Sequence, residues 1–163
     1  MPFGDNETIP KTERISVSYL VERLNERVQV ELYPFVAESD DDRRYVTEAE
    51  LHRPGLALAG YVKLFTHQRI QVIGNTETRY LQNLSKDEQI EAFENLTQFN
   101  IPVLFITAGN ELPNYLKDMA KEANIPVYGT PLETTRFMHQ VRDFLEDQFA
   151  LQTMVHGSMV DVY

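Results

Sequence analysis

The sequence predicts an α/β fold: a largely parallel sheet with helices on both faces, followed by a long helix and a terminal strand. Segments with strand character alternate along the chain with segments whose apolar residues follow helical spacing, and the links between them are short. Residues 101–107 form an almost continuous apolar run, which is typical of a strand buried on both faces of a parallel sheet. Together these features place the chain in the α/β class.

The N-terminal part of the chain contains one predicted helix and one predicted strand. Residues 1–14 are polar and include two prolines, so we expect a flexible lead-in. Apolar residues at helical spacing predict a helix over 17–24, and alternation over 28–32 predicts a half-buried strand. The charged run 38–44 has no apolar spacing and is interpreted as a solvated turn rather than a metal or partner site.

The central part begins with a short predicted helix. Pro54 stands where a helix can start, and Gly60 stands where it can stop. Residues 69–74 read as a strand that ends on a glycine. Ser85 and Glu88 have the spacing of a capping box, so they predict the beginning of another helix.

The C-terminal part continues the alternation. A helix is expected from Pro113 to Ala123, followed by a short strand over 125–128. Pro131 lies near the start of a long helix whose apolar residues continue to Leu145. The final residues, 153–163, return to strand character.

The size of the chain is that of an ordinary globular unit, with 163 residues of which 42% are hydrophobic and 25% charged. We expect an N-terminal α/β domain over 15–130 and a connecting helix over 131–151. Residues 152–163 are expected to belong to a separate final segment.

Charge and cysteine content exclude several function classes. The chain has 15 basic and 25 acidic residues, a net charge of −10, which disfavours broad binding to nucleic acid or to an anionic membrane. No apolar run approaches the ~18 residues of a membrane span, and the N-terminus lacks the pattern of a signal peptide. Cysteine is absent, which rules out disulfides, a thiol nucleophile and a cysteine-based zinc site, and which agrees with a cytoplasmic location.

A self-sufficient active site is not visible in the sequence. There is no G-x-x-x-x-G-K-[ST] phosphate loop, no G-x-G-x-x-G and no G-x-S-x-G. The four histidines include no H-x-x-x-H pair, so local spacing supports no metal site. Paired carboxylates of a hydrolase are equally unsupported.

Residues near two helix starts are candidates for binding a substrate or an anion. Thr130, Thr134 and Arg136 surround a strand end and the start of the long helix, where hydroxyls, amides and a guanidinium can hold an anion. The alternative is ordinary capping by Thr130 and a surface arginine. Arg53 stands at the start of the short central helix, where the alternative is turn chemistry alone.

Two further places have both a functional and a structural interpretation. Residues 107–110 follow a buried strand, so they form either a ligand loop or a tight turn that uses the conformational freedom of Gly109. His156 lies within the predicted terminal strand, five residues before Asp161. A catalytic role for His156 stands beside the alternative of a packed, hydrogen-bonded structural histidine.

Taken together, several segments resemble one family, the bacterial HPr kinase/phosphorylases. The resemblance covers most of residues 16–163, and its segments occur in the family's order. The run Thr130–Met138, followed by the His-Gly and Asp-Val-Tyr elements, is its most specific part. The matching stretches are 53–56, 60–61, 68–71 with Gly74 and Glu77, 125–127, 130–138, 155–157 and 160–163.

The resemblance implies a function for the intact protein. Such enzymes phosphorylate a serine of the phosphocarrier HPr with ATP or pyrophosphate and magnesium. They remove the mark by phosphorolysis, in which inorganic phosphate attacks and pyrophosphate is released. The resemblance also implies homo-oligomers, hexamers in the family, a cytoplasmic location and a role in carbon-catabolite regulation.

The sequence departs from the family in one large respect. The family's Asp-Val-Tyr element leads into a phosphate loop, whereas this sequence stops at Tyr163. Residues 152–163 are therefore expected to be a truncated start of the C-terminal kinase domain. Only His156 matches a family active-site position, and no nucleotide-binding residue, metal ligand or cofactor is expected in this chain.

Two classes of function follow from this departure. The first is an enzyme fragment that is inactive alone and belongs to a serine kinase/phosphorylase. The second is a non-catalytic module that binds a ligand or organises an oligomer.

Overall fold

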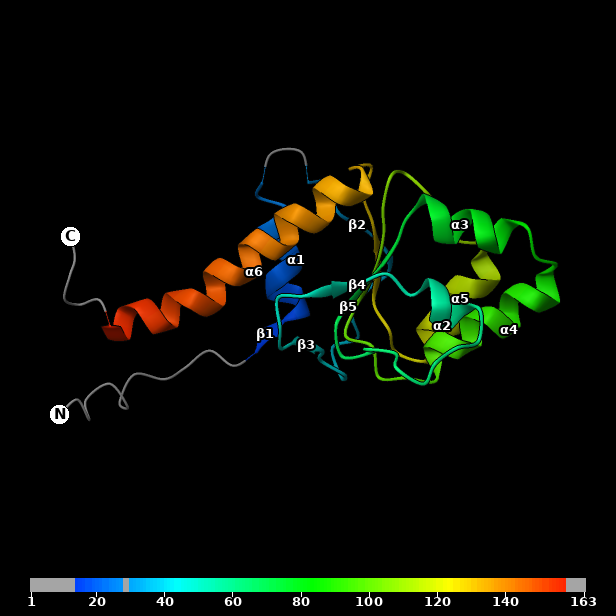
Figure 1. The fold of residues 1–163 in the computed structure, drawn as a ribbon, viewed down its shortest axis with the longest axis horizontal. Coiled ribbons are helices and arrows are strands. Elements are labelled where there is room, and N and C mark those ends of the chain that lie inside the picture. The colour runs from blue at the N-terminus through cyan, green and yellow to red at the C-terminus, as the bar shows by residue number, and fades with distance from the viewer. Residues whose placement is uncertain (1–13, 28–29, 158–163) are drawn as a thin grey trace.

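The structure, a computed structural model, describes residues 14–27 and 30–157, with side chains to residue 150. Its centre is a sheet that lies between two groups of helices (Figure 1). The sheet has five strands in the order β2-β7-β6-β5-β4. Neighbouring strands from β4 to β7 pair in parallel, while β2 pairs antiparallel with β7 at one edge. The strands are β2 (Tyr33–Val36), β4 (Leu51–His52), β5 (Ile70–Ile73), β6 (Leu104–Ile106) and β7 (Val127–Gly129).

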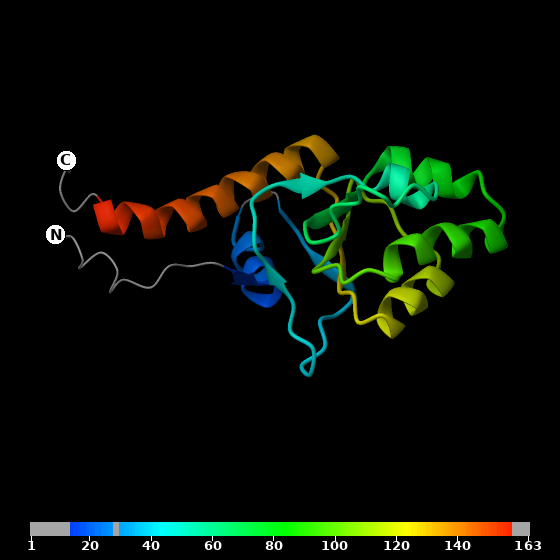
Figure 2. The same ribbon diagram turned by 60° about the horizontal axis from the view of Figure 1, so that its bottom comes forward.

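Helices cover both faces of the sheet, so the predicted α/β class is confirmed. The chain passes from β4 to β7 by stepping in one direction along the sheet, and right-handed crossovers place all the intervening helices on one face. That face carries α2 (Gly55–Leu58), α3 (Asn75–Gln82), α4 (Lys86–Thr97) and α5 (Asn114–Glu122). The opposite face carries α1 (Val17–Leu24) and α6 (Thr134–Gly157), as the two views show (Figures 1 and 2).

Two hydrophobic cores lie on the two faces of the sheet. Along β6, Phe105 faces the core under α1 and α6, while its neighbours Leu104 and Ile106 face the core under α2 to α5. Successive strand residues point to opposite faces, so a strand covered on both sides needs apolar residues throughout. This geometry explains the continuous apolar run over 101–107.

A small antiparallel pair attaches α1 to the domain. It consists of β1 (Ile15–Ser16) and β3 (Tyr45–Val46). Ser16 Oγ accepts a hydrogen bond of 3.2 Å from the Tyr19 amide and so caps α1. In the described part of the chain, no helix combines the length and apolar character that crossing a membrane requires.

Most predicted elements are confirmed. The strand expected over 28–32 is wrong for residues 30–32, and its first two residues lie outside the described residues. Residues 30–32 are not in a strand, and β2 begins at Tyr33, which pairs with Gly129 of β7. The alternating pattern placed Val30 correctly in the core. Pairing with β7, rather than alternation, decides where the strand begins.

The strand expected over 153–163 is wrong for residues 153–157, which continue α6 to Gly157. A strand needs a neighbouring strand for its backbone hydrogen bonds, whereas a helix satisfies its own. Residues 158–163 lie outside the described residues, as do the first 13 residues of the expected lead-in.

Candidate functional site

Four chain segments bring polar groups to one edge of the sheet. Arg53 follows β4, Gly74 follows β5 and Thr107 follows β6, while Thr134 begins α6 after β7. Because the strands are parallel, their carboxyl ends meet at this edge, which is where open α/β sheets bind ligands. We call Arg53, Gly74, Glu77, Thr107 and Thr134 the carboxyl-edge cluster.

An ion pair joins Arg53 to the start of α3. Arg53 Nη2 donates to Glu77 Oε1 at 2.7 Å, and the Gly74 amide donates to the same oxygen at 2.9 Å. The Glu77 side chain is 6% exposed and that of Arg53 is 35% exposed. Glu77 thus occupies the third position of α3 as a fixed anion, where the helix dipole favours negative charge.

Two buried threonines form the other half of the cluster. The Oγ1 atoms of Thr107 and Thr134 lie 2.7 Å apart. Thr107 Oγ1 donates to the Ile73 carbonyl at 3.3 Å, which leaves Thr134 to donate to Thr107. This chain of hydrogen bonds ties the start of α6 to the ends of β5 and β6.

The loops after β6 and β7 are joined directly by backbone hydrogen bonds. Ala108 and Gly109 both have positive φ angles, 58° and 72°. Their amides donate to the Leu132 carbonyl at 2.8 Å and to the Thr130 carbonyl at 3.0 Å. Both amides are therefore occupied by carbonyl oxygens of the loop after β7, which favours the tight-turn interpretation of residues 107–110.

The remaining candidates do not join the cluster. Thr130 is buried, and its Oγ1 accepts from the Leu132 amide at 3.1 Å, which is the chemistry of a local turn. Arg136 is exposed on the first turn of α6 and makes no hydrogen bond or ion pair to any described residue. His156 lies near the end of α6 rather than in a strand, and its side chain is outside the described residues.

Sequence reasoning did not identify the role of Glu77, although its position three residues after a strand-ending glycine was a usable signal.

The sequence analysis also gave no role to His52, which ends β4. Burial lowers the pKa of the His52 imidazole, the charge of Arg69 lowers it further, and Glu77 opposes both effects. The His52 ring packs against Phe65, with centroids 5.7 Å apart.

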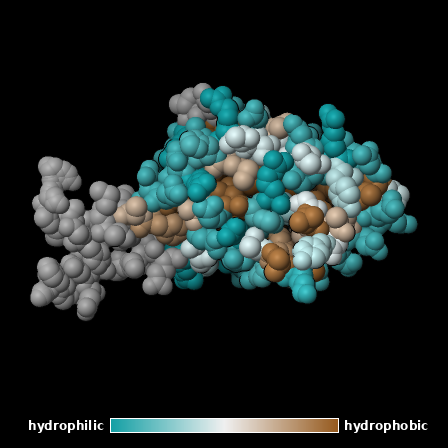
Figure 3. All heavy atoms as spheres, in the orientation of Figure 1, coloured by the Kyte–Doolittle hydropathy of each residue, from teal (hydrophilic) through white to brown (hydrophobic). Residues whose placement is uncertain are grey.

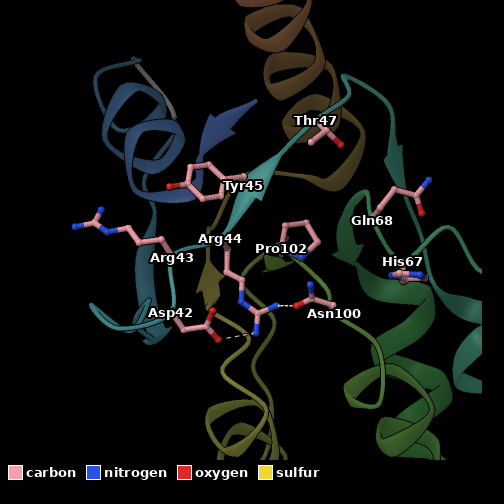
Figure 4. Close-up of a pocket in the computed structure, with 9 residues that line it drawn as sticks. All are labelled: Asp42, Arg43, Arg44, Tyr45, Thr47, His67, Gln68, Asn100 and Pro102. Carbon is pink, nitrogen blue, oxygen red and sulfur yellow. Dashed lines mark hydrogen bonds and ion pairs between the residues drawn. The ribbon is translucent and has the colours of Figure 1, made fainter. Parts of the chain in front are cut away.

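A second polar site lies at the amino ends of β5 and β6, around Arg44 (Figure 4). Its cavity of about 290 Å³ is bordered by Tyr45, His67 and Asn100 among other residues. Arg44 donates to the Ile101 carbonyl at 3.1 Å and to the Ala123 carbonyl at 3.2 Å. It also bonds to Asn100 and forms an ion pair with Asp42.

These contacts correct one part of the sequence interpretation. The charged run 38–44 was expected to be solvated throughout, yet the Arg44 side chain is only 10% exposed. It joins the run to the segments before β6 and after α5 because it donates to one backbone carbonyl oxygen in each. Arg43, by contrast, is exposed as expected.

The fold and the cluster define a class of α/β domain in which polar side chains at the carboxyl ends of the strands bond to one another. Comparison with known proteins then gives the family. The family described as "HPr Serine kinase N terminus" matches residues 15–145, and the chain belongs to that family.

Curated relatives agree with this assignment. The chain is 44% identical over 153 residues to the HPr kinase/phosphorylase of Chloroherpeton thalassium, covering 94% of this chain and 45% of the relative. It is 45% identical over 152 residues to that of Chlorobium limicola, covering 93% of this chain and 46% of the relative. The chain therefore spans about half the length of these relatives.

One solved structure is similar in fold. It is a crystal structure of the CBS and DRTGG domains of the regulatory region of Clostridium perfringens pyrophosphatase, complexed with the activator diadenosine tetraphosphate. The TM-score is 0.51 at 14% sequence identity, covering 80% of this chain and 49% of that one. At this identity the likeness concerns the fold alone.

Proposed function

We propose that the chain is the N-terminal part of a bifunctional HPr kinase/phosphorylase. The intact enzyme transfers a phosphoryl group from ATP or pyrophosphate to a serine hydroxyl of HPr and serves carbon-catabolite regulation in the cytoplasm. In the reverse direction inorganic phosphate attacks phosphoserine and pyrophosphate leaves. The observation that carries this proposal is the family match over residues 15–145, joined to 44% identity with a named enzyme.

Within this proposal, the phosphate groups and magnesium bind outside residues 14–157. Transfer depends on a loop that cradles phosphates and on magnesium, and the sequence contains no phosphate loop. In the carboxyl-edge cluster, Arg53 Nη2 already donates to Glu77, and the Thr107 hydroxyl already donates to a backbone carbonyl. We therefore assign ATP, pyrophosphate and magnesium to other parts of the intact protein, with His156 as the nearest catalytic candidate.

The test compares this chain with the full-length Chloroherpeton thalassium relative. Each protein is mixed with HPr, magnesium and either ATP or pyrophosphate, and phosphoserine is measured by mass spectrometry. We expect phosphoserine with the relative and none above background with this chain. Turnover by this chain at a rate near that of the relative would contradict the proposal that ATP, pyrophosphate and magnesium bind to other parts of the intact protein.

A second candidate function is organisation of an oligomer. The observation that favours it is α6, whose C-terminal half projects beyond the sheet (Figure 2). A projecting helix offers a surface for neighbouring subunits, and a hexamer is the assembly we propose for the intact protein. Sedimentation of the chain with and without residues 146–163 tests this role: loss of a discrete oligomer on truncation supports it, and a monomer in both cases contradicts it.

A further inference from the structure

Exposed apolar side chains gather around α2. Six large hydrophobic side chains are exposed in the described part of the chain, and four of them belong to α2, the segment after it and α3. Leu56 is 70% exposed, Leu64 76% and Tyr61 51%, and Tyr80 lies nearby on α3. Figure 3 shows brown and pale spheres grouped over this region among hydrophilic neighbours. Grouped exposure of this kind marks an interaction surface more often than isolated apolar residues do.

A cavity opens beside these residues, between α2, α3 and α4. Its volume is about 310 Å³. Polar atoms form most of its wall, and Tyr80, Glu88, Glu91 and Asn95 supply polar side chains. Two carboxylates line the cavity and no basic side chain does.

The side chains of the cavity offer several hydrogen-bond acceptors. Glu88 Oε1 accepts from the Ser85 amide at 2.9 Å, which leaves the second carboxylate oxygen without a partner among the described residues. Glu91 makes no ion pair within the described chain. Asn95 directs its Nδ2 at the Leu58 carbonyl, 3.5 Å away, so its Oδ1 remains an acceptor. Hydrogen bonds from Ser85 also lower the pKa of Glu88, which keeps it ionised.

Nearby basic residues do not occupy the cavity. Lys63 and Arg79 are exposed, and neither is part of the lining. Lys86, at the start of α4, places its Nζ 4.8 Å from the centre of the Tyr115 ring. The two glutamates of the cavity thus lack a cation from the described part of this chain.

We propose that this cavity receives an arginine side chain of a partner protein, whose adjacent apolar side chains pack on Leu56, Tyr61 and Leu64. A guanidinium carries five N–H donors and stacks on aromatic rings, which matches two carboxylates, an amide oxygen and the Tyr80 ring. Arginine in a pocket surrounded by apolar contacts is a common anchor of protein interfaces. The exposed leucines favour a protein over a small cation, because a small cation leaves them in water.

The charge requirement is tested with two synthetic peptides. Both carry one central residue flanked by leucines; the central residue is arginine in one and citrulline, its neutral counterpart, in the other. In NMR titrations of the ¹⁵N-labelled chain, we expect saturable shifts in α2, α3 and α4, with the arginine peptide binding at least ~10-fold more tightly, about 1.4 kcal/mol. Equal affinity of the two peptides, or shifts confined to other elements, would overturn the proposal.

Matched variants locate the binding groups. Glu88→Gln with Glu91→Gln should abolish the preference for arginine, and glutamine preserves the capping geometry at Glu88. Glu94→Gln on the same helix is the control, because Glu94 is exposed and lies outside the cavity lining. If Glu94→Gln weakens binding as much as the pair does, the effect is one of general charge and the cavity is not the receptor.

The apolar contribution is tested separately. The double variant Leu56→Ser with Leu64→Ser should bind both peptides ~10-fold more weakly. Its melting temperature should be nearly unchanged, because both leucine side chains are exposed. Free N-acetylarginine methylamide serves as a small-cation probe. If it binds as tightly as the arginine peptide, a protein partner is ruled out. None of these measurements depends on the proposed kinase activity.

Discussion

Gly74 and Thr134 approach so closely that no side chain fits between them. A methyl group built on Gly74 would lie 2.5 Å from Thr134 Oγ1 and 2.8 Å from Arg53 Nη2. The φ angle of Gly74 is −112°, so the backbone conformation is open to any residue. Space, rather than conformational freedom, requires glycine at the point where α6 crosses the end of β5.

We predict that Gly74→Ala destabilises the domain by about 1–3 kcal/mol, the usual cost of overpacking. Chemical denaturation monitored by circular dichroism measures this difference. Gly55→Ala is the matched control, since its added methyl would meet nothing closer than 3.9 Å and it lies in α2. The control should be neutral or slightly stabilising; equal destabilisation by both variants would show that the contact with Thr134 is unimportant.

Arg53→Ala should destabilise the domain because it leaves the buried Glu77 carboxylate without its cation. We expect about 1–3 kcal/mol, since the Arg53 side chain is 35% exposed and water partly screens the pair. Adding Glu77→Gln should recover part of the loss, which a double-mutant cycle measures. Strict additivity of the two substitutions would contradict an energetic link between them.

Arg44→Met should cost more than Arg43→Met, although the two residues are neighbours. Arg44 is buried and bonds to the Ile101 and Ala123 carbonyls, which methionine leaves without donors. We expect a loss of about 2–4 kcal/mol for Arg44 and less than about 0.5 kcal/mol for exposed Arg43. Urea unfolding of both variants measures the difference; similar midpoints would show that Arg44 is not a structural clamp.

Stability should decrease as the pH falls below 6.5, partly through His52. The pKa of His52 is lowered in the folded protein from an ordinary value of 6.5, so below that pH the unfolded chain takes up the proton first. The free energy of unfolding then falls until the pH passes the folded pKa. His52→Gln should have a smaller decrease between pH 7.5 and pH 5 in urea titrations, and an identical decrease would exclude His52 as a contributor.

Sequence signals that span only a few residues were sufficient to predict several helices and strands. Ser85 and Glu88 form the capping box that begins α4, with hydrogen bonds of 2.9 and 3.2 Å. Helix α3 was missed because two of its three buried residues, Glu77 and Thr78, are polar, so its inward face does not look apolar in the sequence. Its position is stabilised by the Glu77 carboxylate and Arg53, which are 24 residues apart.

The sequence by itself determined the α/β class, the order of the main elements and the resemblance to HPr kinase/phosphorylases, because capping, periodicity and motifs act over a few residues. Only the tertiary structure decided which candidates meet. It joins Arg53 to Glu77 and Thr107 to Thr134, and it leaves Arg136 in solvent. It also shows Arg44 as a buried clamp within a run of charges. These outcomes depend on contacts between residues far apart in the chain, whose partners are set by the parallel sheet and the crossing of α6 over its carboxyl edge.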